Sequence, residues 1–363
     1  MISSTATLAA AADASPQPRF VMPHEAEPQA RTWMAWPVAK YTIDGSLAPV
    51  DEVYRAWAAV ANTISGFQPV TVLVTPSHLG VAQRHLCAEV ELWPVPVDDA
   101  WLRDSGPTFV RDRGQTALGA VSWEFNAWGG LDLAGTTADN EVAARVAEAA
   151  GATLVRSRLV NEGGGIHADG EGTLLATETV QTDPRRNPGW SPAEIEAEFA
   201  RTLGIRQVIW LERGLHRDFG PLGTRGHVDM VATFSAPGTV LLHAQRDPAH
   251  PDHALSARLR ASLAGEGDAR GRKLTVVDLP APETLRDGHG WVDYNYVNHA
   301  VVNGAVIMGS FDDPSDDRAR GILREAYPGR EVVPIDARPI FALGGGVHCI
   351  TQQQPALTPG NAR

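Results

Sequence analysis

Two similar glycine triplets constrain the fold of this chain more than any other feature. The segment Gly-Gly-Gly-Ile-His begins at Gly163, and a near copy, Gly-Gly-Gly-Val-His, begins at Gly344. Glycines at strand ends let the backbone come close to a ligand or to another segment of the chain. The repeat therefore predicts pseudo-symmetric modules gathered around a common centre. Chance is the competing explanation, because the chain holds 35 glycines.

Short apolar runs alternate with stretches whose apolar residues recur at helical spacing. An Asn-Gly turn inside residues 301–308 predicts a hairpin, and Ser191 followed by Glu194 predicts a capping box at the start of a helix. Further strands are expected at residues 70–74, 91–97 (at a sheet edge, because of its prolines), 208–211, 239–243, 332–335 and 339–343, and further helices at residues 140–150 and 316–327. Hairpins mixed with crossover helices indicate an α/β chain of repeated β-β-α-β units.

Charge and hydropathy narrow the class of protein. A net charge of -12 disfavours nucleic-acid binding, which needs a basic face, and suits a cationic substrate, although acidic surfaces also serve solubility. No stretch approaches the roughly 20 apolar residues that span a bilayer, and the N-terminal segment lacks the features of a secretory signal. We expect a cytoplasmic protein that does not bind membranes, with a disordered tail at residues 1–18, a single α/β domain at residues 19–355 and a C-terminal tail at residues 356–363.

The two cysteines are too few and too far apart for a disulfide framework. We interpret Cys87 and Cys349 as free thiols in a reducing compartment. Cys87 has no assignable role. Cys349 follows the second glycine triplet near the end of the chain, which makes it a candidate nucleophile. The competing interpretation is an inert core thiol, because buried inert cysteines are the more common kind.

Two acidic segments contain candidate binding groups. Asp104 lies in the segment Trp-Leu-Arg-Asp-Ser-Gly-Pro that begins at Trp101, and Glu162 directly precedes the first glycine triplet. A carboxylate beside a tryptophan suits a planar cation, through hydrogen bonds at its edge and ring contact on its face. The competing interpretations are a turn aspartate or a partner of Arg103 for Asp104, and a solvent-facing loop acid for Glu162.

Two His-x-Asp pairs leave two kinds of chemistry open. On a strand, His227 and Asp229 would share a face, because the side-chain period is two. Such a pair serves acid–base catalysis or metal binding. His167 and Asp169 form a second pair, which could also bond internally or cap a hairpin. A metal-dependent hydrolase with a dinuclear centre is therefore one candidate, but it gives the candidate thiol no role.

These segments together supply a thiol, a histidine and three carboxylates. A protease needs one acid to orient its histidine, not several carboxylates around a nucleophile. Carboxylates raise the pKa of a thiol unless a cationic substrate restores the charge balance. A guanidinium fits, because its planar donors match carboxylates bidentately. A non-catalytic protein that binds arginine-like cations is the third class, and it predicts binding without turnover.

Six segments in sequence order carry a resemblance to a known family. From about Met22 to Pro355 the chain resembles agmatine deiminases, a branch of the guanidine-modifying (pentein) superfamily close to bacterial-type peptidylarginine deiminases. The resemblance implies a five-bladed α/β propeller of ββαβ modules around a central channel, often found as a homo-oligomer. The matching segments are residues 31–37, 101–108, 125–130, 161–172, 226–229 and 344–355.

The resemblance also implies roles for individual residues. Cys349 corresponds to the nucleophile, His227 to the general acid and base, and Glu162 to the carboxylate that orients the histidine. Asp104 and Asp229 correspond to the pair that grips the guanidinium. The substrate-binding set is expected to be Trp101, Asp104, Asp229, Trp128, Gly346 and Arg225.

The implied reaction converts agmatine and water to N-carbamoylputrescine and ammonia through a covalent thiouronium intermediate. This is a step toward putrescine, and it requires no metal or organic cofactor. Another guanidino compound, such as an arginine-like molecule, a guanidino acid or peptidyl-arginine, is the alternative substrate.

Two departures from the family pattern concern the substrate. Gly346 stands where the family commonly has asparagine, and the segment Gly-Thr-Arg-Gly beginning at Gly223 stands where acidic or amide residues are common. Arg225 would disfavour the ammonium of agmatine or favour a carboxylate-bearing substrate. The competing interpretation is that Arg225 points to solvent or pairs with Asp218.

Overall fold

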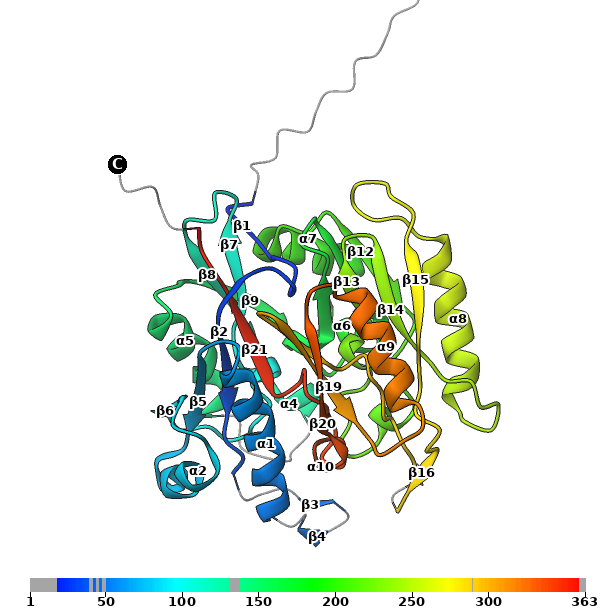
Figure 1. Ribbon diagram of the computed structural model, residues 1–363. Coiled ribbons are helices and arrows are strands. Elements are labelled where there is room, and N and C mark those ends of the chain that lie inside the picture. Colours follow the sequence, from blue (N-terminus) through cyan, green and yellow to red (C-terminus); the bar gives the residue numbers. More distant parts are fainter. Residues whose placement is uncertain are drawn as a thin grey trace, which may run out of the picture.

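The computed structural model describes residues 18–38, 42–43, 46–47, 50–130, 137–288 and 290–358. The expected N-terminal tail, apart from Pro18, lies outside these ranges. The expected C-terminal tail is described only at residues 356–358, where the backbone N–H groups of Ala356 and Thr358 donate to the carbonyls of Pro28 and Gln115. The described chain is a mixed α/β structure (Figure 1).

Five sheets of three or four strands follow one pattern within the described residues. In each sheet, an antiparallel pair of strands is followed by a helix that leads to a parallel strand. In the third sheet, β13 (Ala232–Ala236) pairs antiparallel with β14 (Thr239–Ala244), and α8 (Asp252–Gly265) leads to the parallel strand β15 (Thr275–Pro280). This is the β-β-α-β order expected from the sequence.

Three further sheets repeat this order. The first contains β1 (Phe20–Val21), β7 (Thr108–Asp112), β8 (Leu118–Glu124), α5 (Asp139–Ala149) and β9 (Thr153–Val160). The second contains β10 (Ile166–Ala168), β11 (Thr173–Thr177), α6 (Glu178–Gln181), α7 (Pro192–Leu203) and β12 (Gln207–Leu211). The fourth contains β18 (Ala300–Val302), β19 (Ala305–Ser310), α9 (Asp316–Ala326) and β20 (Glu331–Asp336).

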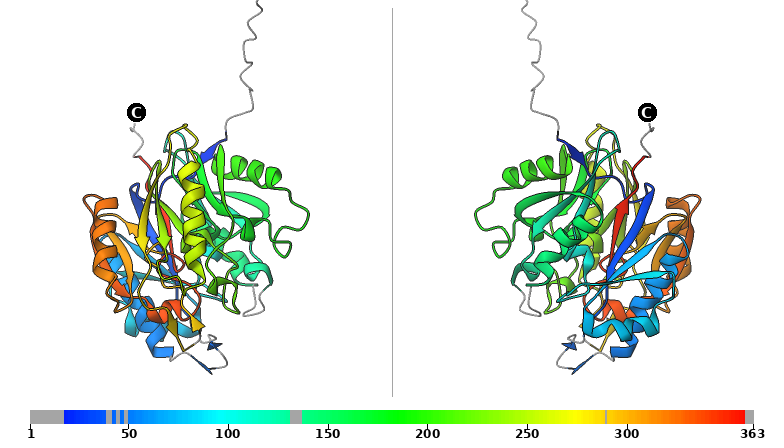
Figure 2. Two further views of the ribbon diagram at one scale, coloured as in Figure 1. Left: turned by 90° about the vertical axis from the view of Figure 1, so that its right-hand side faces the viewer. Right: turned by 90° about the vertical axis from the view of Figure 1, so that its left-hand side faces the viewer.

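The fifth sheet joins the two ends of the chain. The last strand, β21 (Thr351–Pro355), pairs antiparallel with β2 (Gln29–Ala35). The sheet continues through α1 (Val50–Ser65), β5 (Val70–Val74), η1 (Pro76–His78), α2 (Leu79–His85) and β6 (Val90–Pro94). Figure 2 shows β21 in red beside β2 in blue. The arrangement brings the segment before β21, which contains Cys349, into the interior between the other sheets.

The helices lie at the periphery and the strands lie inside (Figures 1 and 2). The strand β5 is buried along its whole length, as its apolar sequence Val-Thr-Val-Leu-Val predicts. Three apolar clusters fill the space between helices and sheets, and the largest includes Trp36, Trp57, Tyr296 and Phe341. No helix in the described part of the chain is both long and apolar enough to cross a membrane.

Most of the expected elements are present. The capping box of Ser191 and Glu194 opens α7, and the Asn-Gly turn joins β18 to β19. The strand predicted at residues 339–343 is wrong, because this segment holds the short helix α10 (Arg338–Phe341). Pro339, the second residue of this helix, favours a helix start here, since the missing N–H would have no helical partner in the first turn. Other short elements are β3 (Thr42–Ile43), β4 (Ser46–Leu47), α3 (Leu102–Ser105), α4 (Ala127–Gly130), η2 (Gly163–Gly165), η3 (Arg217–Phe219), η4 (Val228–Met230), β16 (Arg286–Asp287) and β17 (Gly290–Trp291).

Candidate active site

In each of the five sheets a buried polar residue lies in the segment just before the strand that opens its β-β-α-β unit (β7, β10, β13, β18 or β21). These residues come from distant parts of the sequence, and the repeated strand order gives them equivalent positions. In chain order they are Asp104 before β7, Glu162 before β10, His227 and Asp229 before β13, Asn298 before β18, and Cys349 before β21. The fold therefore unites all five residues that the sequence suggested for catalysis and adds Asn298, which the sequence analysis did not identify.

The space beside Gly164 is the centre of this site. A Cβ atom added to Gly164 would lie 2.5 Å from Nδ1 of His227 and 3.0 Å from both Oδ1 of Asp104 and Oδ2 of Asp229. Any side chain at this position would collide with these groups, so glycine is what lets them converge. Nδ1 of His227 and Oδ1 of Asp229 are buried and have no hydrogen-bond partner among the described residues. Because buried polar atoms are normally paired, these two atoms mark a place that a polar ligand would occupy.

His227 and Asp229 do not lie on a strand, so that prediction is wrong. His227 precedes the 3₁₀ turn η4, which contains Asp229. The carboxylate of Asp218 accounts for this local structure, because it accepts hydrogen bonds from the backbone N–H groups of Thr224, Gly226 and His227. These bonds use donors that a strand ladder would need, and they fold the segment into a loop. The two side chains still meet at Gly164.

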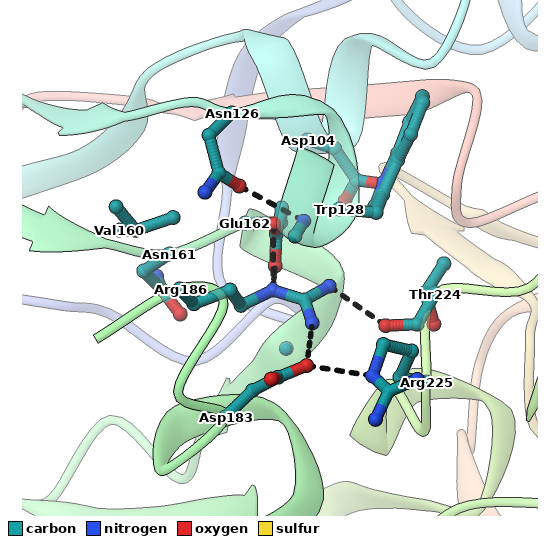
Figure 3. A network of polar contacts seen from close by, with 12 residues as sticks. Asp104, Asn126, Trp128, Val160, Asn161, Glu162, Asp183, Arg186, Thr224 and Arg225 are labelled. Carbon is teal, nitrogen blue, oxygen red and sulfur yellow. Dashed lines mark hydrogen bonds and ion pairs between the residues drawn. The ribbon is translucent and has the colours of Figure 1, made fainter. Parts of the chain in front are cut away.

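A series of ion pairs begins at the carboxylate beside His227. We call it the Glu162 network (Glu162, Arg186, Asp183 and Arg225; Figure 3). Nε2 of His227 lies 3.3 Å from Oε2 of Glu162. Nε of Arg186 donates to both oxygens of Glu162 at 3.0 and 3.1 Å, and its Nη1 lies 3.4 Å from Oδ2 of Asp183. Nε of Arg225 donates to the same Asp183 oxygen at 2.6 Å. The network runs from the candidate acid–base histidine to a partly exposed arginine.

The electrostatics of this network set the protonation of His227. Burial alone would raise the pKa of Glu162, but Arg186 and His227 outweigh burial and lower that pKa to about 2. Burial opposes the charged form of His227, but Asp104, Glu162 and Asp229 outweigh it and raise the pKa of His227 to about 9. At neutral pH the imidazole is therefore positively charged and can act as an acid.

Arg225 has a partner other than the one considered from the sequence. It pairs with Asp183 rather than Asp218, and its side chain is 35% exposed. Its backbone has a φ of 71°, which is uncommon for a residue other than glycine. The preceding Gly223 packs tightly, since an added Cβ atom would lie 1.9 Å from the carbonyl oxygen of Asp218. The departure at Gly223 therefore has a packing reason in this chain.

Cys349 is a buried thiol with two polar neighbours. Nδ2 of Asn298 lies 3.1 Å from Sγ, and Sγ lies 3.5 Å from Oδ2 of Asp229. Burial, together with the charges of Asp229 and Asp104, raises the pKa of the thiol well above its usual value, against the opposing bonds from the backbone of Gly346 and from Asn298. The thiol is therefore protonated until a positive charge enters the site.

Gly346 allows Asn298 to reach the sulfur. A Cβ atom added to Gly346 would lie 2.3 Å from Oδ1 of Asn298. The same Oδ1 accepts the backbone N–H of His348 at 2.9 Å, so both ends of the amide are held beside Cys349. Gly346 therefore shapes the site through packing, and the sequence analysis placed it there only as a substrate-binding residue.

One tryptophan bonds the candidate binding carboxylate, and another packs against the segment that holds Cys349. Nε1 of Trp128 donates to Oδ2 of Asp104 at 2.8 Å, and Trp128 has a left-handed backbone with a φ of 54°. Trp101 precedes α3, and its ring packs so closely on Gly345 that an added Cβ atom would lie 2.6 Å from it. Burial raises the pKa of Asp104 to about 6. The negative charges of Asp229 and Glu162 act in the same direction, and His227 opposes them.

A second buried network lies behind Asp229, and we call it the His348 network (His348, Glu25 and Arg103). Nδ1 of His348 lies 2.8 Å from Oδ2 of Asp229, and its Nε2 lies 3.0 Å from Oε1 of Glu25. Nη1 of Arg103 lies 3.4 Å from the same Glu25 oxygen. The sequence analysis missed this network. Its one signal was the repeated histidine after each glycine triplet, because His167 and His348 both face Glu25.

Glu25, His167 and His348 have ligand atoms within 4.8 Å of one another, a spacing that a metal ion could use. Their contacts argue against such a site. Both ring nitrogens of His348 face carboxylates at hydrogen-bond distance, and the Arg103 guanidinium already lies beside Glu25. Because a second cation would be repelled there, the arrangement fits an ion-pair network rather than a metal site.

The His167 and Asp169 pair has structural partners. The Asp169 carboxylate accepts the backbone N–H groups of Glu171 and Thr173 and the Thr173 hydroxyl, so it caps the turn between β10 and β11. Nε2 of His167 lies 2.6 Å from the Thr233 hydroxyl. Capping the hairpin was one of the roles considered for this pair. The geometry gives no support to a dinuclear metal centre.

Comparisons with known proteins show what this chain is similar to. The family of Porphyromonas-type peptidyl-arginine deiminases matches residues 21–355. The chain is 51% identical over 337 residues to a Streptomyces coelicolor protein provisionally named an agmatine deiminase, and the match covers 93% of this chain and 99% of that protein. It is 39% identical over 363 residues to the agmatine deiminase of Stutzerimonas stutzeri, with 94% and 96% of the two chains covered.

Solved structures extend the comparison to the fold. The agmatine deiminase of Enterococcus faecalis superposes with a TM-score of 0.84 at 32% identity, and the match covers 93% of this chain and 96% of that chain. A match over almost the whole of both chains means that the mixed α/β fold of this chain corresponds to that of the Enterococcus faecalis enzyme.

Proposed function

Because the chain belongs to the family of Porphyromonas-type peptidyl-arginine deiminases, we propose that it hydrolyses the guanidinium group of agmatine, giving N-carbamoylputrescine and ammonia. The observation that carries the proposal is the convergence of Asp104, His227 and Asp229 beside Gly164, with two buried polar atoms of His227 and Asp229 that have no partner among the described residues. Relatives that are named agmatine deiminases support the choice of substrate. The product lies on a route toward putrescine.

We also propose that the five sheets form the blades of a propeller around a central channel, within one catalytic domain at residues 19–355. The common strand order of the sheets and the pairing of β21 with β2, which joins the ends of the chain, support this arrangement. The channel axis would then run close to the five segments that precede the opening strands of the units. A cytoplasmic location and a homo-oligomeric state complete the proposal.

Binding begins with charge pairing. The guanidinium lies between the carboxylates of Asp104 and Asp229, and it supplies the hydrogen-bond donors that Oδ1 of Asp229 lacks. Trp128 holds the other oxygen of Asp104, so this carboxylate keeps its orientation. The cation offsets the two negative charges that raise the pKa of Cys349, and the thiol releases its proton to solvent as the substrate binds.

The first half of the reaction forms a covalent intermediate. The Cys349 thiolate attacks the guanidinium carbon, and the C–S bond forms as the electrons of the C=N bond move onto nitrogen. His227, positively charged because its pKa is about 9, donates its proton to the departing amino group. The C–N bond breaks, ammonia leaves, and an S-alkylthiouronium cation remains on the sulfur while the imidazole is neutral.

The second half releases the product. The neutral imidazole of His227 takes a proton from water, and the resulting hydroxide attacks the thiouronium carbon. The C–S bond then breaks, the hydroxyl proton of the adduct returns to the sulfur, and the ureido product leaves. Asn298 donates to the sulfur from 3.1 Å and stabilises it as a thiolate when it attacks and when it departs.

Arg225 supports a second candidate substrate, a guanidino acid. Its guanidinium stays 35% exposed after pairing with Asp183 and could meet a substrate carboxylate. The pairing also offsets much of its charge, which leaves agmatine as the first choice. Ammonia release from agmatine, arginine and a panel of guanidino acids tests the proposal, with the Cys349→Ala variant as the control. Turnover of agmatine that the variant lacks supports the proposal, and no turnover of any guanidine contradicts it.

A further inference from the structure

The ring of His348 lies between two carboxylates. Its Nδ1 is 2.8 Å from Oδ2 of Asp229, and its Nε2 is 3.0 and 3.1 Å from the two oxygens of Glu25. All three side chains are buried. An ionised carboxylate can only accept hydrogen bonds, so a histidine between two of them must donate from both nitrogens. The arrangement therefore holds His348 as an imidazolium.

The surroundings of His348 balance its charge. The titratable groups that face it are Glu25, Asp229, Arg103, His167, His299 and Cys349. Arg103 adds a second positive charge beside Glu25, so two buried cations meet two buried carboxylates. Burial and Arg103 act to lower the pKa of His348, but Glu25 and Asp229 outweigh them and raise it. Buried ions are tolerated when they are paired in this way.

The two oxygens of Asp229 have different surroundings. Oδ2 accepts from His348 and lies 3.5 Å from the Cys349 sulfur, whereas Oδ1 has no partner among the described residues. Without His348, the thiol would be the remaining donor to Oδ2 among these contacts. Loss of the imidazolium charge would let the buried Asp229 carboxylate take up a proton at a higher pH, and a neutral carboxyl group holds a guanidinium far less well than a carboxylate does.

We propose that His348 is a positioning residue for Asp229. Its imidazolium, held by Glu25, keeps Asp229 ionised and turned so that Oδ1 faces the substrate. The inference deepens the proposed function and rests on it, because Asp229 is taken as a guanidinium-binding residue. It separates two tasks: Asp229, which lies 3.5 Å from the sulfur, holds the substrate, and His227 transfers protons.

A binding measurement tests the inference without relying on turnover. In the Cys349→Ala background, guanidinium ion and agmatine are titrated calorimetrically across the acid and neutral pH range. His348→Asn retains an amide donor toward Asp229 but no charge. We expect it to weaken guanidinium binding about tenfold, and the weakening relative to the parent should grow as the pH falls, because the pKa of Asp229 rises while that of Asp104 is about 6 in both proteins.

Two further variants make the test specific. Glu25→Gln keeps the shape of the side chain and removes the charge that holds the imidazolium, so we expect a smaller effect in the same direction. His250→Asn removes another buried histidine, whose Nε2 bonds the carbonyl of Val292, and should leave guanidinium binding unchanged. In the enzyme with Cys349 present, His348→Asn should raise KM by a larger factor than it lowers kcat.

Other outcomes would overturn the positioning role of His348 or separate it from the proposed function. A folded His348→Asn variant that binds guanidinium with unchanged affinity and pH dependence, and loses only thermal stability, overturns the inference. If this variant does not fold, Glu25→Gln decides in the same way. If guanidinium binding shifts as expected but no guanidine compound is turned over by the chain with Cys349, the positioning role stands and the proposed function fails.

Discussion

The Glu162 network and the His348 network support the two sides of one site in different ways. The Glu162 network ends at Arg225, whose side chain is 35% exposed, whereas Arg103 at the end of the His348 network is 4% exposed. The first raises the pKa of the adjacent His227, and the second lowers the pKa of Asp229. The ion pairs behind His227 therefore reach a partly exposed residue, whereas those behind Asp229 end at a buried one.

Loss of either buried arginine should cause the largest effect. Arg186→Met removes the guanidinium between the buried carboxylates of Glu162 and Asp183, which should cost about 3–5 kcal/mol of stability. Arg103→Met should cost a similar amount through Glu25. Thermal and denaturant unfolding measure both, and Arg201→Met on the exposed face of α7 is the control. A stability change below about 1 kcal/mol for both variants would mean that the networks are not ion-paired as described.

Glu162→Gln should produce the next largest effect, on catalysis rather than on binding. The variant keeps a hydrogen-bonding group beside His227 but removes the negative charge, so kcat should fall at least about a hundredfold. Glu198→Gln, which removes a carboxylate of α7 away from the site, is the matched control. A rise in KM with unchanged kcat would assign Glu162 to substrate binding instead.

The pH dependence of kcat/KM gives the sign of this effect. The pH profile of kcat/KM reports ionisation in the free enzyme, whose His227 must be protonated to release ammonia. Glu162 helps to raise the pKa of His227 to about 9, so activity should be lost as the pH rises through this region. In Glu162→Gln the pKa falls, and the alkaline limb should move to lower pH. An unmoved limb would show that Glu162 does not act through His227.

Asn298→Ala should have an intermediate effect, confined to the sulfur. Loss of a hydrogen bond to a charged group costs about 1.5–3 kcal/mol, so alkylation of Cys349 by an amidine electrophile should slow about tenfold or more. Asn62→Ala is the matched control, because Asn62 bonds the backbone near Cys87 rather than the site. Equal alkylation rates for Asn298→Ala and the native chain would remove Asn298 from the mechanism.

Arg225→Ala should have the smallest effect. Partly exposed ion pairs contribute about 0–1 kcal/mol, so kcat on agmatine should stay within about threefold of the native value. Arg338→Ala, an exposed arginine paired with Asp336, is the control. The relative rates on agmatine and guanidino acids are the informative readout. If guanidino acids lose activity selectively, Arg225 contacts the substrate tail.

Local sequence patterns predicted the β-β-α-β units of this fold better than they predicted the pairing of its two chain ends. Hairpins and crossover helices had clear local signals, such as the capping box at Ser191 and the Asn-Gly turn before β19. The pairing of β21 with β2 joins residues more than three hundred positions apart, for which no local pattern exists. The strand predicted at residues 339–343 failed because a short apolar run fits a helical turn equally well, and the proline favoured the helix.

The catalytic candidates could be found from the sequence because they stand in distinctive segments, whereas their supports do not. Glu25, Arg186 and Asp218 lie in ordinary polar stretches, and only the fold brings them behind the site. Asn298 lies just before β18, as the other site residues lie just before the opening strands of their sheets. This equivalence can be recognised only once the strand order is known. Long-range contacts of this kind depend on packing rather than on local sequence.

The most direct test of the account is to trap the intermediate on Cys349. The chain is mixed with agmatine, quenched with acid during turnover, and examined by intact-protein and peptide mass spectrometry. The account predicts an adduct on Cys349 with the mass of agmatine less one ammonia, absent from Cys349→Ala, which should also release no ammonia. Ammonia release by Cys349→Ala at the native rate, with no adduct on the native chain, would contradict it.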